Sequence, residues 1–335
     1  MLTIGPYTFN NRLILAPMAG ISDAVFRELC RQNGAGHTLA EMVASKKSLW
    51  ESKKSATRHV NLSDPEPRAI QLLGTHPDEL AQAAAWQVAQ GAQIIDLNMG
   101  CPAKKVCDVA AGSALMRYPE RVADIFKAVV SAVDVPVTVK TRTGSDHDHK
   151  NALQIGLLAQ EHGLQAITIH GRTRADKFNG LAEYETIKQV KQALSIPVIA
   201  NGDICTPEQA KFVLKYTLAD GLMIGRAAQG YPWIFREINH YLTTHTHAEP
   251  PTSAEFYSTL LKHVLGLHDL YGETLGVRIA RKHIGWYAQR LPNNGKSNNK
   301  SDGNALRKTF NALETSQAQL EHLELYFNSQ PTATL

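Results

Sequence analysis

The sequence predicts an α/β fold, a (β/α)8 TIM barrel, followed by a smaller all-α helical domain. Eight short segments rich in Ile, Val and Leu recur at intervals of roughly 25–30 residues, and each is followed by a helix-sized segment. Continuous apolar runs are typical of parallel strands buried on both faces. Eight such strand–helix units favour a closed barrel over an open sheet. Strands are expected at residues 12–16, 38–42, 68–72, 93–97, 135–140, 166–170, 198–200 and 221–224.

The length of the chain indicates more than one domain. It has 335 residues, whereas a single α/β barrel takes up to about 250. Its composition, 43% hydrophobic and 20% charged, excludes a disordered chain and a collagen-like fibre. We expect the barrel at residues 1–242, a linker at 243–252, which has two prolines near its end, and a helical domain at 253–335. The polar segment 292–304 is predicted to be a mobile loop.

Several classes of protein are excluded by missing signals. No apolar stretch approaches the about 18 residues of a membrane-spanning helix, and residues 1–12 lack the pattern of a signal peptide. We therefore expect a cytoplasmic protein, and no feature points to an obligate protein partner. A His/Asp cluster at 146–149 and the pair His245 and His247 lack a further ligand set, so no metal site is predicted. Four cysteines without a CxxC pair indicate neither a zinc ribbon nor a disulfide framework: Cys30, Cys101, Cys107 and Cys205.

Positive charge is concentrated near the C-terminus. Residues 1–277 contain 27 basic and 27 acidic side chains, whereas residues 278–308 contain eight basic side chains and one acidic one. This local excess favours a polyanionic partner, although a solvated helix face explains the charge alone equally well. Three aromatic rings in the same segment, which are able to stack on bases, favour nucleic acid: His283, Trp286 and Tyr287.

Polar residues or glycines follow the predicted strands. Because barrel enzymes work at the C-terminal ends of their strands, these residues should converge on one pocket. Each has an ordinary structural explanation on its own, but eight coincidences weaken that explanation for the set. The segments are Pro17–Gly20, Glu41–Met42, Gln71, Asn98–Pro102, Lys140, His170–Thr173, Asn201–Asp203 and Gly225–Arg226.

Part of this set predicts a flavin mononucleotide, FMN. Gly202 and the pair Gly225–Arg226 follow the seventh and eighth strands, where barrels commonly bind phosphate. Lys140 would place a cation beside an electron-rich ring, and the amide of Gln71 offers a donor and an acceptor to the ring edge. No GxGxxG motif follows a strand, so a separate dinucleotide-binding domain is not expected.

Cys101 is the candidate for catalysis because it precedes a proline in a loop directly after a predicted strand. A thiol with the ordinary pKa of about 8.5 is mostly protonated at neutral pH, so it serves as a general acid or as a nucleophile. Lys104 and Lys105 would favour the thiolate if they lay close, which leaves both roles open. The other three cysteines are expected to be structural, with Cys30 and Cys205 buried as small apolar side chains.

The motifs of this sequence resemble those of the tRNA-dihydrouridine synthases, most closely the bacterial B-type subgroup. The most specific are NMGCP, HGRTR and NGDI. The resemblance extends past the barrel and covers nearly the whole chain. It rests on PMAGISDAVFR (17–27), DLNMGCPAKKV (96–106), VKTRTG (139–144), TIHGRTR (168–174), IANGDI (199–204), MIGRAAQGYPWIF (223–235) and RIARKHIGWY (278–287).

The resemblance implies an FMN-bound barrel, a helical tRNA-binding domain and NADPH as electron donor. It implies reduction of the C5–C6 double bond of one tRNA uridine, in the D-loop, with Cys101 as proton donor. Asn98 is implied to hold the target base, and Arg278, Arg281 and Lys282 to contact tRNA. The implied flavin contacts are Ala16, Pro17, Met18, Gln71, Lys140, His170, Asn201, Gly202, Asp203, Gly225 and Arg226.

Two other functions fit parts of the sequence. A flavin-dependent dehydrogenase of a free pyrimidine, of the dihydropyrimidine or dihydroorotate type, shares the barrel, the FMN and the loop cysteine, but gives no reason for the basic helical region. A non-catalytic RNA-binding protein with a degenerate barrel would not need the complete set of strand-end residues.

Overall fold

Eight parallel strands close into a barrel in the computed structural model, which describes residues 1–50, 57–103, 106, 111–291 and 299–329. The order around the barrel is β10-β3-β4-β5-β6-β7-β8-β9. The predicted fold class is confirmed, and each predicted strand matches one barrel strand to within two residues at either end. The barrel strands are β3 (Leu13–Leu15), β4 (His37–Ala44), β5 (Ala69–Leu73), β6 (Ile94–Met99), β7 (Val137–Arg142), β8 (Ala166–His170), β9 (Val198–Asn201) and β10 (Gly221–Ile224).

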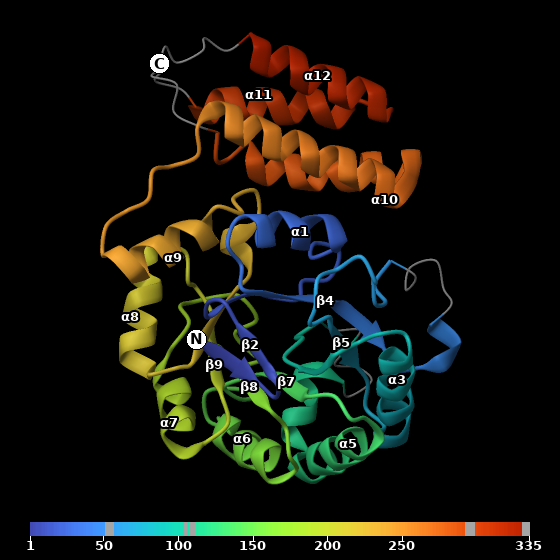
Figure 1. The fold of residues 1–335 in the computed structure, drawn as a ribbon, viewed down its shortest axis with the longest axis vertical. Coiled ribbons are helices and arrows are strands. Elements are labelled where there is room, and N and C mark those ends of the chain that lie inside the picture. Colours follow the sequence, from blue (N-terminus) through green and yellow to red (C-terminus); the bar gives the residue numbers. More distant parts are fainter. Residues whose placement is uncertain (51–56, 104–105, 107–110, 292–298, 330–335) are drawn as a thin grey trace. The chain divides into compact units, whose positions relative to one another are not determined.

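Helices α3, α5, α6, α7 and α8 surround these strands (Figure 1). Their ends follow from local sequence. In α3, Pro77 occupies the first turn and Asp78 and Glu79 complement the helix dipole; the Thr206 hydroxyl accepts from the Gln209 amide at 3.2 Å to begin α8. The helices are α1 (Ala24–Gln32), α3 (Pro77–Ala89), α5 (Pro119–Ala132), α6 (Ala152–Glu161), α7 (Glu185–Ala193) and α8 (Pro207–Thr217), with 3-10 turns η1 (Lys47–Leu49), η2 (Gly112–Arg117) and η3 (Arg226–Ala228).

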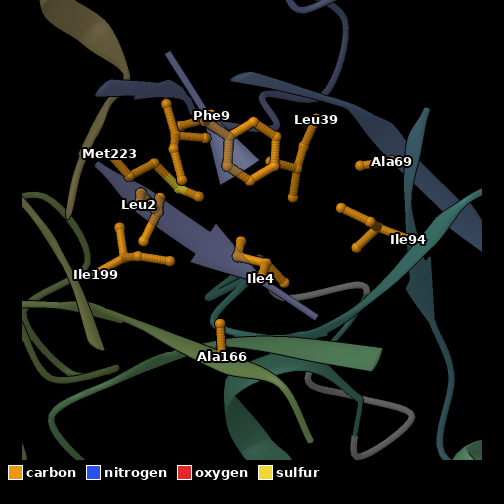
Figure 2. Close-up of a cluster of buried hydrophobic side chains, with 11 residues drawn as sticks. Leu2, Ile4, Phe9, Leu39, Ala69, Ile94, Ala166, Ile199 and Met223 are labelled. Atoms are coloured by element: carbon orange, nitrogen blue, oxygen red, sulfur yellow. The ribbon is translucent and has the colours of Figure 1, made fainter. Parts of the chain in front are cut away.

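A short hairpin that sequence reasoning did not predict fills the N-terminal end of the barrel. It consists of β1 (Leu2–Ile4) and β2 (Tyr7–Phe9), which pair antiparallel across a turn with Gly5 at a φ of +55°. Its apolar side chains pack against the first residues of β5, β6 and β8, namely Ala69, Ile94 and Ala166 (Figure 2). Apolar packing thus occupies this end, and the polar strand-end residues lie at the other.

The chain divides into two compact units, Met1–Arg27 with Ala35–Gly225 and Glu28–Gly34 with Arg226–Leu335. The division falls before the segment expected to be a linker, because α9 packs with the C-terminal helices: Trp233 stacks on Phe256 with ring centroids 5.4 Å apart. The separate functions of the two domains stay a prediction. The second unit contains α9 (Ile234–Thr244), α10 (Ser253–Tyr287), α11 (Asn299–Ala312) and α12 (Ser316–Asn328).

Two features of the helical unit differ from a plain reading of the sequence. Helix α10 is broken at Gly272, whose φ of 72° and ψ of 174° are not helical. The predicted polar loop over 292–304 is wrong at its C-terminal end, because α11 begins at Asn299; residues 292–298 lie outside the described part. Leu306 and Phe310 are fully buried and stabilise α11 through the core, which its polar first turn does not reveal. Among the described residues, no helix is long and apolar enough to cross a membrane.

Candidate active site

The predicted site residues of the barrel unit lie toward the C-terminal ends of the strands. Asn98 is the fifth residue of β6, and its register partner on β7 is Lys140. His170 and Asn201 are the last residues of β8 and β9, and they are register partners as well. Gln71 lies on β5 and contacts Asn98 directly. The closed barrel therefore brings residues from five of its strands to one end.

Lys140 provides a positive charge at this end of the barrel. Its ammonium donates to the Asn201 side-chain oxygen at 3.1 Å, and its side chain is only partly exposed. Burial, together with the charge of Arg142, lowers the pKa of Lys140 to about 8, although the charges of Asp96 and Cys101 oppose the shift. The ammonium is therefore mostly charged at neutral pH. The interaction with Cys101 also shows that the thiol lies within electrostatic range of this cation.

Asp96 lies deeper in the barrel and is only 1% exposed. One carboxylate oxygen accepts from the Gln71 amide nitrogen at 2.7 Å, and the other accepts from the Thr138 hydroxyl at 2.7 Å. Burial raises the pKa of Asp96 to about 6, while these two hydrogen bonds and the charge of Lys140 limit the rise. The carboxyl group is therefore mostly ionised at neutral pH, in a fully buried position.

Asn98 fixes the start of the loop that carries Cys101. Its side-chain oxygen accepts from the backbone amides of Gly100 at 3.2 Å and Cys101 at 3.0 Å. Its amide nitrogen donates to the Gln71 side-chain oxygen at 2.7 Å. On the other side, the Cys101 carbonyl accepts from the Ser113 hydroxyl at 2.9 Å. The backbone of Cys101 is thus held on both sides, and its side chain is partly exposed.

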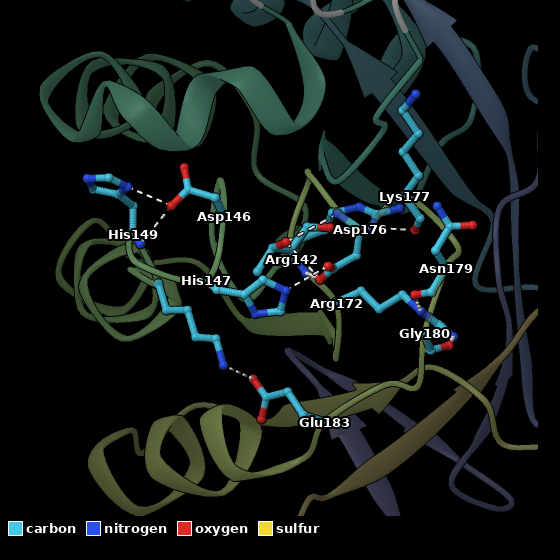
Figure 3. Close-up of polar contacts among 12 residues, drawn as sticks. Arg142, Asp146, His147, His149, Arg172, Asp176, Lys177, Asn179, Gly180 and Glu183 are labelled. Atoms are coloured by element: carbon cyan, nitrogen blue, oxygen red, sulfur yellow. Dashed lines mark hydrogen bonds and ion pairs between the residues drawn. The ribbon is translucent and has the colours of Figure 1, made fainter.

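The loops after β8 and β9 are joined by a bidentate ion pair. The guanidinium of Arg172 donates to the two carboxylate oxygens of Asp203 at 2.9 and 2.6 Å. Arg172 also lies 3.3 Å from the Nε2 atom of His170. It donates to the Gly180 carbonyl at 2.7 Å (Figure 3). Asp203 accepts in addition from the Ala182 amide at 2.8 Å. The carboxylate of Asp203 therefore orders the polypeptide around His170.

Arg142 is a structural part of the site that sequence reasoning did not single out. It is 2% exposed and donates to the backbone carbonyls of Gly100 at 2.7 Å and Thr173 at 2.9 Å. It also donates to the Lys177 carbonyl at 2.8 Å (Figure 3). Its position two residues after Lys140 was an available signal, because alternate residues of a strand face the same side.

Two positions at the strand ends, Gly202 and Gly225, have no side chain. Gly202 has a φ of +122°, and a Cβ there would lie 2.8 Å from the Ala182 side chain and 3.0 Å from the His170 ring. A Cβ at Gly225 would meet only the Met18 sulfur, at 3.5 Å, and the Ala16 side chain, at 3.6 Å. The segment Ala16–Met18, with Pro17 at its centre, therefore lies beside Gly225. The open backbone at Gly225 permits the close approach of a ligand, whereas Gly202 serves close packing within the protein.

The match to known proteins covers both compact units. Residues 14–329 match the family described as Dihydrouridine synthase (Dus). The chain belongs to the dihydrouridine synthase family. This membership confirms the predicted family and the predicted class of oxidoreductase, and it decides against a free-pyrimidine dehydrogenase and a non-catalytic barrel.

Individual relatives of this dihydrouridine synthase agree with the family match. Proteins named tRNA-dihydrouridine synthase B from Pseudomonas putida and Klebsiella pneumoniae are 54% and 55% identical to it. Each alignment covers 98% of this chain, and 94% and 99% of the respective relative. The structure of histamine dehydrogenase from Rhizobium sp. 4-9 shares the fold, with a TM-score of 0.53 and 14% identity over 79% of this chain and 50% of that chain.

The basic residues expected to contact tRNA lie on α10 of the helical unit. Arg278 and Lys282 are exposed, and the Lys282 ammonium lies 5.9 Å from the centre of the Trp286 ring. Arg281 is partly buried and donates to the Leu313 carbonyl at 2.7 Å. Two of the three side chains are therefore displayed on the surface, whereas the third also ties α10 to the end of α11.

The cysteines apart from Cys101 divide differently from the prediction. Cys30 is buried, as expected, but Cys205 is exposed, so its expected burial is wrong. Cys205 directly precedes the Thr206 cap of α8, where the chain runs over the surface. The expectations for Cys107, and for Lys104 and Lys105, concern residues outside the described part.

The His/Asp cluster after β7 forms side-chain pairs. The Nδ1 atom of His149 lies 2.6 Å from a carboxylate oxygen of Asp146, and the Nε2 atom of His147 lies 2.9 Å from Asp176 (Figure 3). Over the described ranges, no group of three or more His, Cys, Asp or Glu side chains is arranged to hold a metal ion.

Proposed function

We propose that this chain reduces the C5–C6 double bond of a D-loop uridine in tRNA to 5,6-dihydrouridine, with FMN held at the barrel mouth, NADPH as electron donor and Cys101 as proton donor. Family membership supports the reaction. The observation that carries the assignment of the residues is the position of Cys101 just after β6, where Asn98 and Ser113 hold its backbone and its side chain is partly exposed. A protein that acts on tRNA in this way would work in the cytoplasm.

The residues at the barrel mouth fit FMN. Lys140 offers a partly buried ammonium to an electron-rich ring, held in place by Asn201. Gly202 and Gly225 follow the two strands where barrels bind phosphate, and Gly225 leaves the backbone open there. Arg226, next in the chain, would pair with that phosphate. When bound, FMN would supply hydride transfer to the C6 atom of the uracil ring.

The chain's own residues would position the base and move one proton. Cys101 would donate its proton to the C5 atom of the uracil ring. The side-chain oxygen of Asn98 accepts from two backbone amides, and its NH2 group donates one hydrogen to Gln71. Its remaining hydrogen faces only a weak acceptor, the Met42 sulfur at 3.7 Å. We therefore expect Asn98 to donate to a carbonyl oxygen of the base.

Recognition of tRNA would depend on charge and on an unstacked base. A uridine must leave its stacked position to enter a barrel mouth, at a cost of a few kcal/mol by analogy with base flipping. The exposed side chains of Arg278 and Lys282 would contact phosphates and help offset that cost. Single bases that are splayed out are the usual targets of sequence-specific RNA recognition.

The decisive experiment compares Cys101→Ala with Cys205→Ala, which removes an exposed thiol. The Cys101→Ala protein should retain FMN and oxidise NADPH, but should not form dihydrouridine. The Cys205→Ala protein should add two hydrogens to one tRNA uridine, detected by mass analysis of the digested tRNA. Free uridine should not replace tRNA as oxidant of the reduced protein. Full tRNA turnover by Cys101→Ala would refute the role of Cys101.

A further inference from the structure

A chain of buried and partly buried hydrogen bonds leads from Asp96 to the loop that carries Cys101. Gln71 donates to Asp96 at 2.7 Å, Asn98 donates to Gln71 at 2.7 Å, and the Cys101 amide donates to Asn98 at 3.0 Å. We call these four groups the Asp96 relay. The relay crosses from β6 to β5 and back to the end of β6, so it connects a buried carboxylate with the loop that follows the same strand.

The relay has one direction because of its first member. An ionised carboxylate only accepts hydrogen bonds, so the NH2 group of Gln71 must face Asp96. The oxygen of Gln71 then faces Asn98, which must present its NH2 group in return. The oxygen of Asn98 is left to face the loop, where it accepts from the amides of Gly100 and Cys101. Each amide orientation therefore follows from the one before it.

Without the carboxylate, the NH2 group of Gln71 loses its acceptor, and only the Gly100 and Cys101 amides at the other end still favour this order. The two ends of a side-chain amide have nearly the same shape, and hydrogen bonding alone decides how it is turned. If Gln71 turned, Asn98 would meet an NH2 group and would have to turn as well. Its own NH2 group would then face the amides of Gly100 and Cys101, where two donors oppose each other. The loop would lose its anchor.

We propose that Asp96 is a positioning residue, which sets the orientation of Gln71 and Asn98 and thereby fixes the backbone of Cys101. Asp96 is 1% exposed, and its carboxylate is occupied by Gln71 and Thr138. Its effect on the reaction passes through the relay. The inference rests on the proposed function for the role of Cys101, but the geometry of the loop is testable without any activity.

The first measurement is the rate at which iodoacetamide alkylates Cys101 in the full-length protein, followed by mass spectrometry of the Cys101 peptide. Asp96→Leu removes the acceptor, whereas Asp96→Asn retains an oxygen for Gln71, because the Thr138 hydroxyl accepts as well as donates. Thr138→Val is the matched control, since it deletes a hydrogen bond to the other oxygen of Asp96 and leaves the relay intact. Measurements at pH 8 keep Asp96 ionised.

The rate for Asp96→Leu should differ at least threefold from that of the wild type. Asp96→Asn and Thr138→Val should stay within twofold of the wild type. If Asp96→Leu does not fold, Gln71→Met interrupts the relay one step later and should give the same change. An unchanged alkylation rate in whichever of these two variants folds would overturn the proposal. So would an equal change in Asp96→Asn and Asp96→Leu, because charge rather than hydrogen-bond direction would then be responsible.

The second measurement is the rate of reoxidation of the reduced protein by tRNA under single-turnover conditions. A loop displaced by about 1 Å lowers a rate by up to about 100-fold, so we expect Asp96→Leu to be at least tenfold slower than Asp96→Asn. Equal rates would overturn the functional part of the proposal. If wild-type protein is not reoxidised by tRNA at all, the proposed function fails, while the alkylation rates still decide the relay.

Discussion

Arg172 and Asp203 form a bidentate ion pair that connects the loops after β8 and β9 beside His170. The Arg172 side chain is 3% exposed and that of Asp203 is 23% exposed. Without Asp203, the buried Arg172 would keep two carbonyl acceptors and the His170 ring nitrogen, but it would lose the carboxylate that balances its charge. The pair therefore holds His170 and both loops in one arrangement.

Asp203→Ala should lower the free energy of unfolding by about 3 kcal/mol, which is typical for breaking a buried ion pair. It should also reduce the FMN retained on purification, because the loops around His170 lose their connection. Urea unfolding and the flavin absorbance measure the two effects. Lys150→Ala is the control, since it breaks a more exposed pair with Glu183 at 3.3 Å and should change stability by less than about 1 kcal/mol. Equal losses in the two variants would contradict this interpretation.

Gly202→Ala should be more destabilising than Gly180→Ala, although both residues have positive φ angles. At Gly202 the added Cβ meets Ala182 and the His170 ring, so we expect backbone strain and overpacking of about 1–3 kcal/mol each. At Gly180 nothing lies within 4 Å of the Cβ, which leaves strain of about 1 kcal/mol. Urea midpoints and FMN retention compare the two proteins. Similar midpoints would show that Gly202 is not closely packed.

The stability of the protein should depend on Asp96 between about pH 4 and pH 6. Burial raises the pKa of this carboxyl from 3.8 to about 6, so the folded chain binds more protons than the unfolded chain in this window. The folded state therefore loses stability relative to the unfolded state as the pH rises through the window. Lys140, which faces Asp96, has a pKa near 8 and stays charged throughout. Asp96→Asn should remove this dependence.

Urea unfolding of wild type and Asp96→Asn at pH 4.5 and pH 7 measures that effect. The unfolding free energy of Asp96→Asn minus that of the wild type should be larger at pH 7 than at pH 4.5. A difference that is the same at both values would show that the carboxyl titrates normally.

Arg278→Ala and Lys282→Ala should each weaken tRNA binding. Each change should also reduce the slope of log Kd against log salt concentration by about one. Both side chains are exposed on α10, as expected of phosphate contacts. Arg281→Ala should behave differently, because Arg281 donates to the Leu313 carbonyl and its loss should mainly lower stability. Filter binding at several salt concentrations tests the first effect and thermal unfolding the second. An unchanged salt dependence in both Arg278→Ala and Lys282→Ala would place the tRNA elsewhere.

The barrel was predictable because its strands have a strong local signal. Strands β8 and β10 match their predicted ranges, since every residue in each of them is apolar or buried. The hairpin of β1 and β2 was not predicted, because strands of three residues are too short to show periodicity. The start of α11 was missed because its first residues are polar, while Leu306 and Phe310 secure it from further along the chain.

The candidate site was predictable where a polar residue interrupts or follows an apolar strand, and not where contacts between distant parts of the chain define the role of a residue. Gln71, Lys140 and Asn201 stood out as polar residues in or directly after apolar strands. The roles of Arg142 and Asp96 depend on contacts with residues far away in the sequence, such as Thr173 and Gln71. Hydrogen bonds of that kind leave no pattern that spacing or composition reveals.

The three carbonyl contacts of Arg142 have a consequence for hydrogen exchange. One guanidinium holds Gly100 in the loop after β6 and both Thr173 and Lys177 in the loop after β8. Displacement of either loop would disturb the guanidinium group that also holds the other. Their amide protons should therefore exchange with deuterium as a single cooperative unit, with one shared opening rate, rather than as two independently fraying segments.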